Sequence, residues 1–261
     1  MTARLLVLAS LGFMTLPTVI VLVASFNATE IMSFPPTGWS LRWYVNALTY
    51  PQFQRAAVNS VIVTGLSTVV ALPLGTAAAL ALGRGRARGR AVWTAVLLSP
   101  LVIPGVAAGL GMLIVAASLG LLASRVVLIV AHVIVVLPFV VRSVSVSVAN
   151  LDPLLERAAA SLGASPWRVF RRVTLPLLRP GLLAALLFAL IVSVNEFVVS
   201  LFISTRVSEI LPVAMFTYVV NYTDPTMAAV SVIFIGTTLT AVVIADRYLN
   251  LSRVFQIEEH Q

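Results

Sequence analysis

Residues 150–180 read NLDPLLERAAASLGASPWRVFRRVTLPLLRP, a stretch that contains two signals for the start of a helix. Asp152-Pro153 and Ser165-Pro166 each place a side chain that caps helices directly before a proline, which fits the first helical position. Gly163 lies between them, where a left-handed residue ends the first helix. The stretch therefore predicts two short helices joined by a glycine corner, and Leu175-Pro176 is expected to end the second.

The two short helices carry different side chains. In the first, Leu154, Ala158 and Leu162 recur at a spacing of four and form an apolar face. The cationic positions of the second are Arg168, Arg171 and Arg172. The apolar face needs a surface to cover it, and the residues alone fit two such surfaces, the lipid interface and a groove in a soluble partner protein.

Outside this stretch the chain is too apolar for a soluble domain. Of its 261 residues 60% are hydrophobic and 10% are charged, with a mean hydropathy of +1.05, whereas soluble domains carry about 25% charged residues. Because about 20 consecutive apolar residues cross a bilayer as a helix, the predicted fold class is an all-α, polytopic transmembrane helical bundle. Its six predicted spans are 5–26, 58–82, 91–117, 122–141, 180–203 and 227–246. The first is expected to be a retained helix, since no small-residue cleavage site follows it.

All 17 basic residues are arginine, and their positions predict the orientation in the membrane. With both ends in the cytoplasm, 13 arginines lie on the cytoplasmic side: Arg4, Arg84, Arg86, Arg88, Arg90, Arg142, Arg157, Arg168, Arg171, Arg172, Arg179, Arg247 and Arg253. Four lie outside: Arg42, Arg55, Arg125 and Arg206. This excess satisfies the positive-inside rule, so both termini are predicted to be cytoplasmic. The net charge of +8 is thus attributed to topology and membrane lipid, and no nucleic-acid partner is expected.

The composition excludes several kinds of chemistry. The chain has no cysteine, two histidines and no His-Glu-x-x-His motif, so we predict no catalytic residues and no metal site. It also has no lysine, which the Walker A phosphate-binding loop requires. We therefore expect that the chain is not an enzyme and binds no cofactor, and that ATP and Mg are bound by a separate ATPase subunit.

The stretch quoted first resembles a known family. Residues 156–163, ERAAASLG, are followed after nine residues by 173–176, VTLP. This spacing resembles the cytoplasmic EAA loop of binding-protein-dependent ABC importer permeases, which reads Glu-Ala-Ala, three residues, Gly, nine residues and Ile-x-Leu-Pro. The loop also lies between the fourth and fifth of six predicted spans, as in that family. Arg157 holds the position of the family glutamate and Glu156 precedes it by one residue, a turn of about 100° on a helix.

Motifs elsewhere resemble the spermidine/putrescine branch of this family. They are 25–27, 40–44, His132 with 137–141, 195–200 and 209–212. The resemblance implies a type I ABC importer permease fold in the bacterial cytoplasmic (inner) membrane, forming half of a translocation pathway for a polyamine or a similar organic cation. It also implies three partners: a second permease subunit in a heterodimer, two copies of a cytoplasmic ATPase, and a periplasmic or lipid-anchored substrate-binding protein.

The resemblance implies one transmembrane domain over 1–261. Residues 1–57 form the first span and an outer loop, 58–249 form a five-span permease core, and 250–261 form a cytoplasmic tail. Residues 150–178 are the cytoplasmic coupling loop. The residues expected to contact the ATPase are Leu154, Leu155, Glu156, Arg157, Ala158, Ala159, Leu162, Gly163, Ala164 and Ser165.

One carboxylate, Glu196, is predicted to lie well inside a span, about 24 Å along the fifth helix. An acid at that depth faces the bundle interior or water and has a partner. Two roles are open: attraction of a cationic substrate, or a structural pair with Arg206 or with the sister subunit. The predicted pathway residues are Asn195, Glu196, Tyr218 and Tyr222. His132, in the fourth span, is expected to be a packed, hydrogen-bonded residue.

Three alternatives to a polyamine importer are another imported solute, a secondary transporter and a simple channel. Permeases similar to this one import aminoethylphosphonate, thiosulfate, sugars or ferric iron. A secondary transporter would show broken helices in related repeats and ion-coupling acids near the middle of the membrane, whereas this sequence has one such acid and no inverted repeat. A simple channel would give no reason for the glycine corner at Gly163.

Overall fold

The computed structural model describes residues 2–31, 33–84, 89–122 and 124–249. The predicted tail at 250–261, with Arg253, and two arginines of the predicted cytoplasmic side, Arg86 and Arg88, lie outside these described residues. Within them the regular structure is helical, apart from one isolated bridge between Asn27 and Trp39. This agrees with the predicted all-α class.

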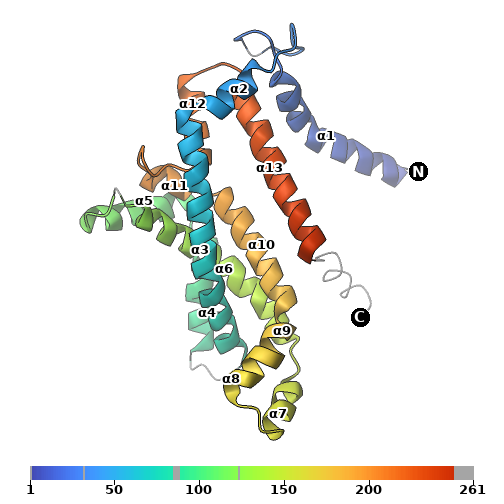
Figure 1. Ribbon diagram of the computed structural model, residues 1–261, viewed down its shortest axis with the longest axis vertical. Coiled ribbons are helices and arrows are strands. Elements are labelled where there is room, and N and C mark those ends of the chain that lie inside the picture. Colours follow the sequence, from blue (N-terminus) through green and yellow to red (C-terminus); the bar gives the residue numbers. More distant parts are fainter. Residues whose placement is uncertain (1, 32, 85–88, 123, 250–261) are drawn as a thin grey trace. The chain divides into compact units, whose positions relative to one another are not determined.

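The helices follow one another along the chain as shown in Figure 1. They are α1 (Thr2–Ala24), α2 (Arg42–Thr49), α3 (Pro51–Gly83), α4 (Arg90–Leu98), η1 (Ser99–Leu101), α5 (Gly105–Ser118), α6 (Arg125–Ala149), α7 (Pro153–Ser161), α8 (Pro166–Val169), η2 (Phe170–Thr174), α9 (Leu175–Leu177), α10 (Arg179–Val194), α11 (Val198–Ile203), α12 (Leu211–Asn221) and α13 (Thr226–Leu249). The chain divides into two compact units. Unit 1 comprises Met1–Val58 and Ile210–Ala241, and unit 2 comprises Asn59–Glu209 and Val242–Gln261.

Four described helices are long and apolar enough to cross a membrane: α1, α3, α6 and α13. Two bent helix pairs pass the same test of length and composition. The first joins Arg90–Leu101 to Gly105–Ser118, and the second joins Pro166–Leu177 to Arg179–Val194. When each bent pair is counted as one span, the described chain has up to six spans by length and composition, which is the number that the sequence predicts. The second pair begins at Pro166, however, whereas the predicted fifth span begins at 180.

The third span does not follow the continuous path expected over 91–117. Its two helical segments meet at an angle of 99°, with the break between Leu101 and Gly105. Pro100 lies in the short 3-10 turn η1, and Pro104 occupies the N-cap position of α5. Because proline has no backbone N–H to donate, Pro100 and Pro104 each remove one helical hydrogen bond and together permit this sharp bend.

The fifth span also differs from its predicted course over 180–203. Helix α10 ends at Val194, residues 195–197 interrupt it, and α11 begins at Val198. At the other end, Leu175-Pro176 does not end the second short helix, which continues through the π-helical turn η2 into α9. The wide turn ends at Thr174, two residues before Pro176, whose missing N–H removes one α-helical hydrogen bond. The chain instead bends by 67° between α9 and α10.

Small residues at a spacing of four hold the core of unit 2 together. On α3 they are Ala71, Gly75, Ala79 and Gly83, and on α10 they are Gly181, Ala185, Ala189 and Ser193. Helix α6 presents the buried valines Val136, Val140 and Val144 at the same spacing. Four residues make slightly more than one helical turn, so each set forms a stripe, and small residues let the helix backbones approach closely.

The closeness of α3 to α6 can be tested at Gly75. A Cβ atom at this position would lie 2.5 Å from Cγ1 and 2.9 Å from Cβ of Val140. Gly75→Ala should therefore force the two helices apart and lower the free energy of unfolding by roughly 1–3 kcal/mol. The measurement is the thermal midpoint of the purified protein in detergent. Gly65→Ala on the same helix is the matched control, because a Cβ there would meet no atom within 4 Å; equal midpoints for the two variants would contradict the prediction.

Candidate functional site

Helix α7 begins and ends as its sequence predicts. Asp152 caps it by accepting a hydrogen bond from the backbone N–H of Leu154 at 2.8 Å, and Pro153 occupies the first turn. At its other end Gly163 has a φ of +81°, in the left-handed region that favours glycine. The N–H of Ala164 donates to the carbonyl of Ala159 at 3.1 Å, which closes the corner. The cap and the glycine corner are therefore confirmed.

The start of the next helix differs in one detail. Ser165 occupies the N-cap position of α8 and Pro166 follows at its start, as expected. The Ser165 hydroxyl, however, makes no capping hydrogen bond. The fixed backbone of Pro166 thus contributes to the start of this short helix without support from the serine side chain. We refer to α7, the corner and α8, residues 153–169, as the knob.

Glu156 connects the knob to the rest of unit 2 through an ion pair and a hydrogen bond. Its Oε1 lies 2.6 Å from Nη2 of Arg84, the residue directly after α3, and it also accepts a hydrogen bond from the hydroxyl of Thr174 in η2. Thr174 is fully buried, and the Glu156 side chain is 22% exposed. One carboxylate therefore joins three segments of the chain, α7, the end of α3 and the π-helical turn. We refer to Glu156, Arg84 and Thr174 as the brace.

The opposite side of the knob is apolar and exposed. Leu154 is 64% exposed, Leu162 is 89% exposed and Trp167 is 66% exposed. Trp167 also stacks on Phe170 with ring centroids 5.6 Å apart. Sequence reasoning missed Trp167, although a tryptophan directly after a helix start in a loop rich in arginine was a signal for it. The knob thus presents large apolar side chains that this chain leaves uncovered.

The ten residues expected to contact an ATPase divide by exposure. Seven are exposed: Leu154, Leu155, Arg157, Ala158, Leu162, Gly163 and Ser165. Three are partly buried: Glu156, Ala159 and Ala164. The structure brings all ten together in the knob, and it turns Glu156 away from the exposed face. Their contact with an ATPase stays a prediction.

Glu196 lies at the interruption between α10 and α11. Its Oε1 accepts a hydrogen bond from the backbone N–H of Val199 at 2.9 Å, within the first turn of α11. No ion pair joins it to Arg206 within the part of the chain that the structure describes. Asn195 is exposed, and its side-chain amide donates to the carbonyl of Ile191.

A cavity of about 770 Å³ opens beside Glu196 in unit 2. Its walls come mainly from α5 and α6 and are apolar, with Met112, Val130 and Phe139 among them. Of the described residues that line it, Glu196 is the one that carries a charge. The cavity therefore combines an apolar wall with a single carboxylate.

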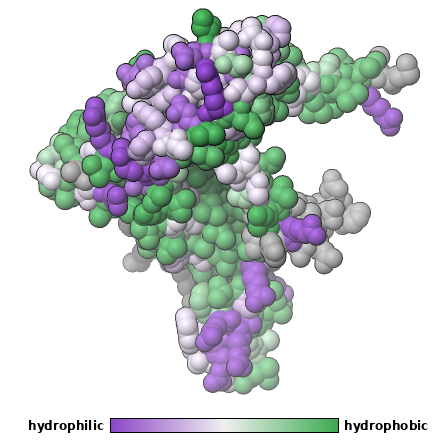
Figure 2. Space-filling view, turned by 45° about the horizontal axis from the view of Figure 1, so that its top comes forward, coloured by the Kyte–Doolittle hydropathy of each residue, from purple (hydrophilic) through white to green (hydrophobic). Residues whose placement is uncertain are grey.

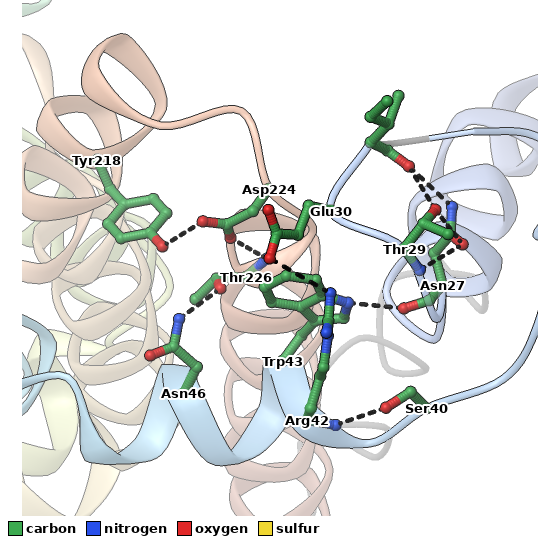
Figure 3. Close-up of polar contacts among 11 residues, drawn as sticks. Asn27, Thr29, Glu30, Ser40, Arg42, Trp43, Asn46, Tyr218, Asp224 and Thr226 are labelled. Atoms are coloured by element: carbon green, nitrogen blue, oxygen red, sulfur yellow. Dashed lines mark hydrogen bonds and ion pairs between the residues drawn. The ribbon is translucent and has the colours of Figure 1, made fainter.

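The other two predicted pathway residues belong to unit 1. Tyr218 is 4% exposed and packs with Tyr50 and Phe53, while Tyr222 is 48% exposed. Figure 3 shows the Tyr218 hydroxyl directed at Asp224, to which it donates at 2.9 Å. Burial raises the pKa of Tyr218 to about 12, so its hydroxyl stays protonated and remains a donor. A pathway role for either tyrosine stays a prediction.

The same region of unit 1 anchors α2. The indole Nε1 of Trp43 donates to the backbone oxygen of Asn27 at 2.6 Å, and the amide of Asn46 donates to the hydroxyl of Thr226 at 2.8 Å. Figure 3 shows both contacts beside the pair of Tyr218 and Asp224. The buried polar groups of this region are thus hydrogen-bonded, and its aromatic side chains form the core of unit 1.

His132 is packed and hydrogen-bonded, as predicted from its place in an apolar span. It is fully buried on α6, with Nδ1 2.8 Å from the hydroxyl of Ser193 and Nε2 2.9 Å from the hydroxyl of Ser200. Ser193 is the last residue but one of α10 and Ser200 lies in α11, so the imidazole bridges the interruption in the fifth span. Among the described residues no group of three or more His, Cys, Asp or Glu side chains is placed to hold a metal ion.

Comparisons with known proteins agree with this architecture. Residues 71–251 match the family described as "Binding-protein-dependent transport system inner membrane component". The chain is 32% identical over 240 residues to the putrescine transport system permease protein PotI of Escherichia coli strain K12, covering 88% of this chain and 85% of that protein. It is 28% identical over 239 residues to the spermidine/putrescine transport system permease protein PotC of the same strain, covering 89% and 90%.

A solved structure shows the same fold. The crystal structure of a bacterial ABC transporter involved in the import of the acidic polysaccharide alginate contains a chain that superposes with a TM-score of 0.73, at 17% sequence identity, over 95% of this chain and 94% of that one. The predicted ABC importer permease fold is therefore confirmed. The family match covers more than half of the chain, and the chain belongs to the binding-protein-dependent transport system inner membrane components as a permease subunit.

Proposed function

We propose that this permease subunit forms half of the translocation pathway of an ATP-driven importer for a polyamine or a similar organic cation. The observation that carries the proposal is the likeness to PotI, which extends along 88% of the chain. The proposed partners are a second permease subunit in a heterodimer, two copies of a cytoplasmic ATPase, and a periplasmic or lipid-anchored substrate-binding protein. Both termini are proposed to be cytoplasmic because that orientation places most arginines inside.

The coupling loop at 150–178 is the proposed contact with the ATPase. Its support is the exposed apolar surface of the knob, above all Leu162 and Trp167, which an amphipathic helix buries in a partner groove. ATP and Mg are proposed to bind to the ATPase, since this chain lacks the lysine of a Walker A loop. Closure of two ATPases on nucleotide would move two such loops, one on each permease, and the movement would reorient the spans.

The proposal is tested with the assembled transporter in proteoliposomes that contain ATP. Uptake of labelled putrescine and spermidine is measured with and without the substrate-binding protein, and aminoethylphosphonate, thiosulfate, a sugar and ferric iron serve as alternative solutes. ATP-dependent uptake of a polyamine is expected. Uptake of one alternative solute with none of a polyamine would overturn the substrate assignment, and an ATPase that still associates after deletion of 153–175 would overturn the coupling assignment.

The carboxylate of Glu196 provides a second test of the substrate class. Glu196→Gln keeps a side-chain oxygen that can accept the hydrogen bond from Val199 but removes the negative charge from the cavity. We expect polyamine uptake to fall about tenfold. The attraction between the Glu196 carboxylate and a cationic substrate contributes several kcal/mol in a partly apolar site, and the cost of desolvating the two charges offsets much of this gain. Uptake rates at several substrate concentrations provide the measurement.

The matched control for this test is Glu30→Gln, which makes the same change of charge at a carboxylate that is 81% exposed and does not line the cavity. It should transport at close to the wild-type rate. Equal rates for Glu196→Gln and wild type would show that the carboxylate has no part in cation transport and serves only to cap α11.

A further inference from the structure

We infer that the ATPase surface that receives α7 carries a carboxylate opposite Arg157, so that the contact pairs the exposed arginine of α7 with an acidic side chain of the groove. This inference rests on the proposed docking of the knob to an ATPase and specifies the chemistry of the partner. It follows from where the structure directs two adjacent side chains, Glu156 and Arg157.

The Glu156 side chain is directed into unit 2. Its carboxylate is bound inside unit 2 by Arg84 and Thr174, so its charge is already neutralised within this chain. The other acidic residue of the knob region, Asp152, caps the N-terminus of α7 through the N–H of Leu154. Neither carboxylate is left to bind a cationic group on a partner without giving up a contact that positions α7.

The Arg157 side chain is exposed on another face of α7. Consecutive residues on an α-helix are separated by about 100°, so Arg157 points away from the brace. It shares the outward face with Leu154, Ala158 and Ser161, all of which are exposed. Within the described part of the chain the ion pairs are Arg84 with Glu156 and Arg42 with Glu30, and neither includes Arg157. Its guanidinium is therefore free to bind a carboxylate from outside, a pairing for which its planar donors are suited.

The place of α7 in unit 2 favours a protein as the partner of Arg157. Figure 1 shows α7 at one end of this unit, beyond α8 and α9, and at the opposite end from α5 and α11. Figure 2 shows hydrophilic residues gathered at the same end, below a largely hydrophobic surface. Arg171, Arg172 and Arg179 lie nearer to the start of α10 along the chain, where lipid headgroups are the natural counter-ions. Arg157 instead accompanies the exposed leucines of the knob, a combination that fits a protein groove with an apolar floor and an acidic rim.

The experiment measures the Kd of the ATPase for the complete permease pair in nanodiscs at low and at physiological salt. Arg157→Glu should raise the Kd about tenfold or more, because it places two like charges across the contact. Arg157→Lys should remain within about threefold of wild type, since it keeps the charge. The matched control is Arg90→Glu, an equal reversal at an exposed arginine on α4 and outside the coupling loop at 150–178, which should change the Kd by less than about twofold.

Two further arms make each outcome decisive. If Leu162→Asp weakens association and Arg157→Glu does not, the knob docks but the inferred carboxylate does not exist. If neither change weakens association, the proposed docking itself fails. If Arg157→Glu lowers only the binding to vesicles of phosphatidylglycerol and phosphatidylethanolamine, the counter-ion of Arg157 is lipid and the inference is overturned. Recovery of the Arg157→Glu complex by an acidic-to-arginine change in the ATPase would identify the carboxylate.

Discussion

Glu156→Ala is expected to reduce ATP-dependent uptake roughly tenfold or more while the spans remain folded. The substitution removes both hydrogen bonds of the brace, to Arg84 and to Thr174, and so frees α7 from the end of α3. A hydrogen bond to a charged group contributes about 1.5–3 kcal/mol when it is shielded from water. Arg84 is 51% exposed, so screening lowers that contribution. If the brace favours the docking orientation of the knob by about 2 kcal/mol, its removal would leave only a small fraction of the molecules with the knob in that orientation.

The partner residue of the brace supplies the control for this prediction. Arg84→Ala removes the same ion pair from the other side and should reduce uptake by a similar factor. If both residues act through one interaction, the double variant should be little worse than either single variant, as in a double-mutant cycle. Normal elution of the detergent-solubilised protein in size-exclusion chromatography would exclude misfolding. Wild-type uptake by both single variants would show that the brace does not position the knob.

Leu162→Asp is expected to weaken association with the ATPase about 100-fold and to abolish transport. Leu162 is 89% exposed at the end of α7, so the change adds no buried charge within the isolated subunit. In a docked complex the same position would be desolvated, and an unpaired carboxylate in an apolar contact is strongly unfavourable.

The control for Leu162 is a change that keeps its volume and apolar character. Leu162→Met should bind and transport close to wild type, because methionine fills the same space with a flexible apolar chain. Co-purification with the ATPase and a titration of binding in nanodiscs supply the two measurements. If Leu162→Asp bound as tightly as Leu162→Met, the exposed face of the knob would not be the docking surface.

Much of the fold was predictable because it follows from local rules. The apolar stretches predicted the six spans, and Asp152 and Gly163 predicted where α7 begins and ends. His132 was predicted to be hydrogen-bonded because a polar ring in an apolar span needs partners. Each of these predictions rests on one continuous segment of the chain, although the partners of His132, Ser193 and Ser200, could not be read from that segment.

The features that sequence reasoning missed depend on residues far apart in the chain. Glu156 pairs with Arg84 across 72 positions, and no pattern within α7 identifies that partner. The angle of 99° between the two helices of the third span could not be predicted, because Pro100 and Pro104 indicate a bend without giving its size. Tyr218 was singled out by its position before the last span, yet its ring is buried among the aromatic residues of unit 1. Burial and pairing of this kind are set by packing between helices.

The small-residue stripe on α3 has a consequence for the lengths that this helix can have. Gly75 lies against Val140 and Gly83 lies against Val148, so the two helices keep one register over eight residues. One residue inserted between Gly75 and Gly83 would rotate every later position by about 100° and turn Gly83 away from Val148. Substitutions on the outer face of α3 leave this register unchanged, whereas a single insertion or deletion destroys it. Natural variation within this part of α3 should therefore consist of replacements at constant length.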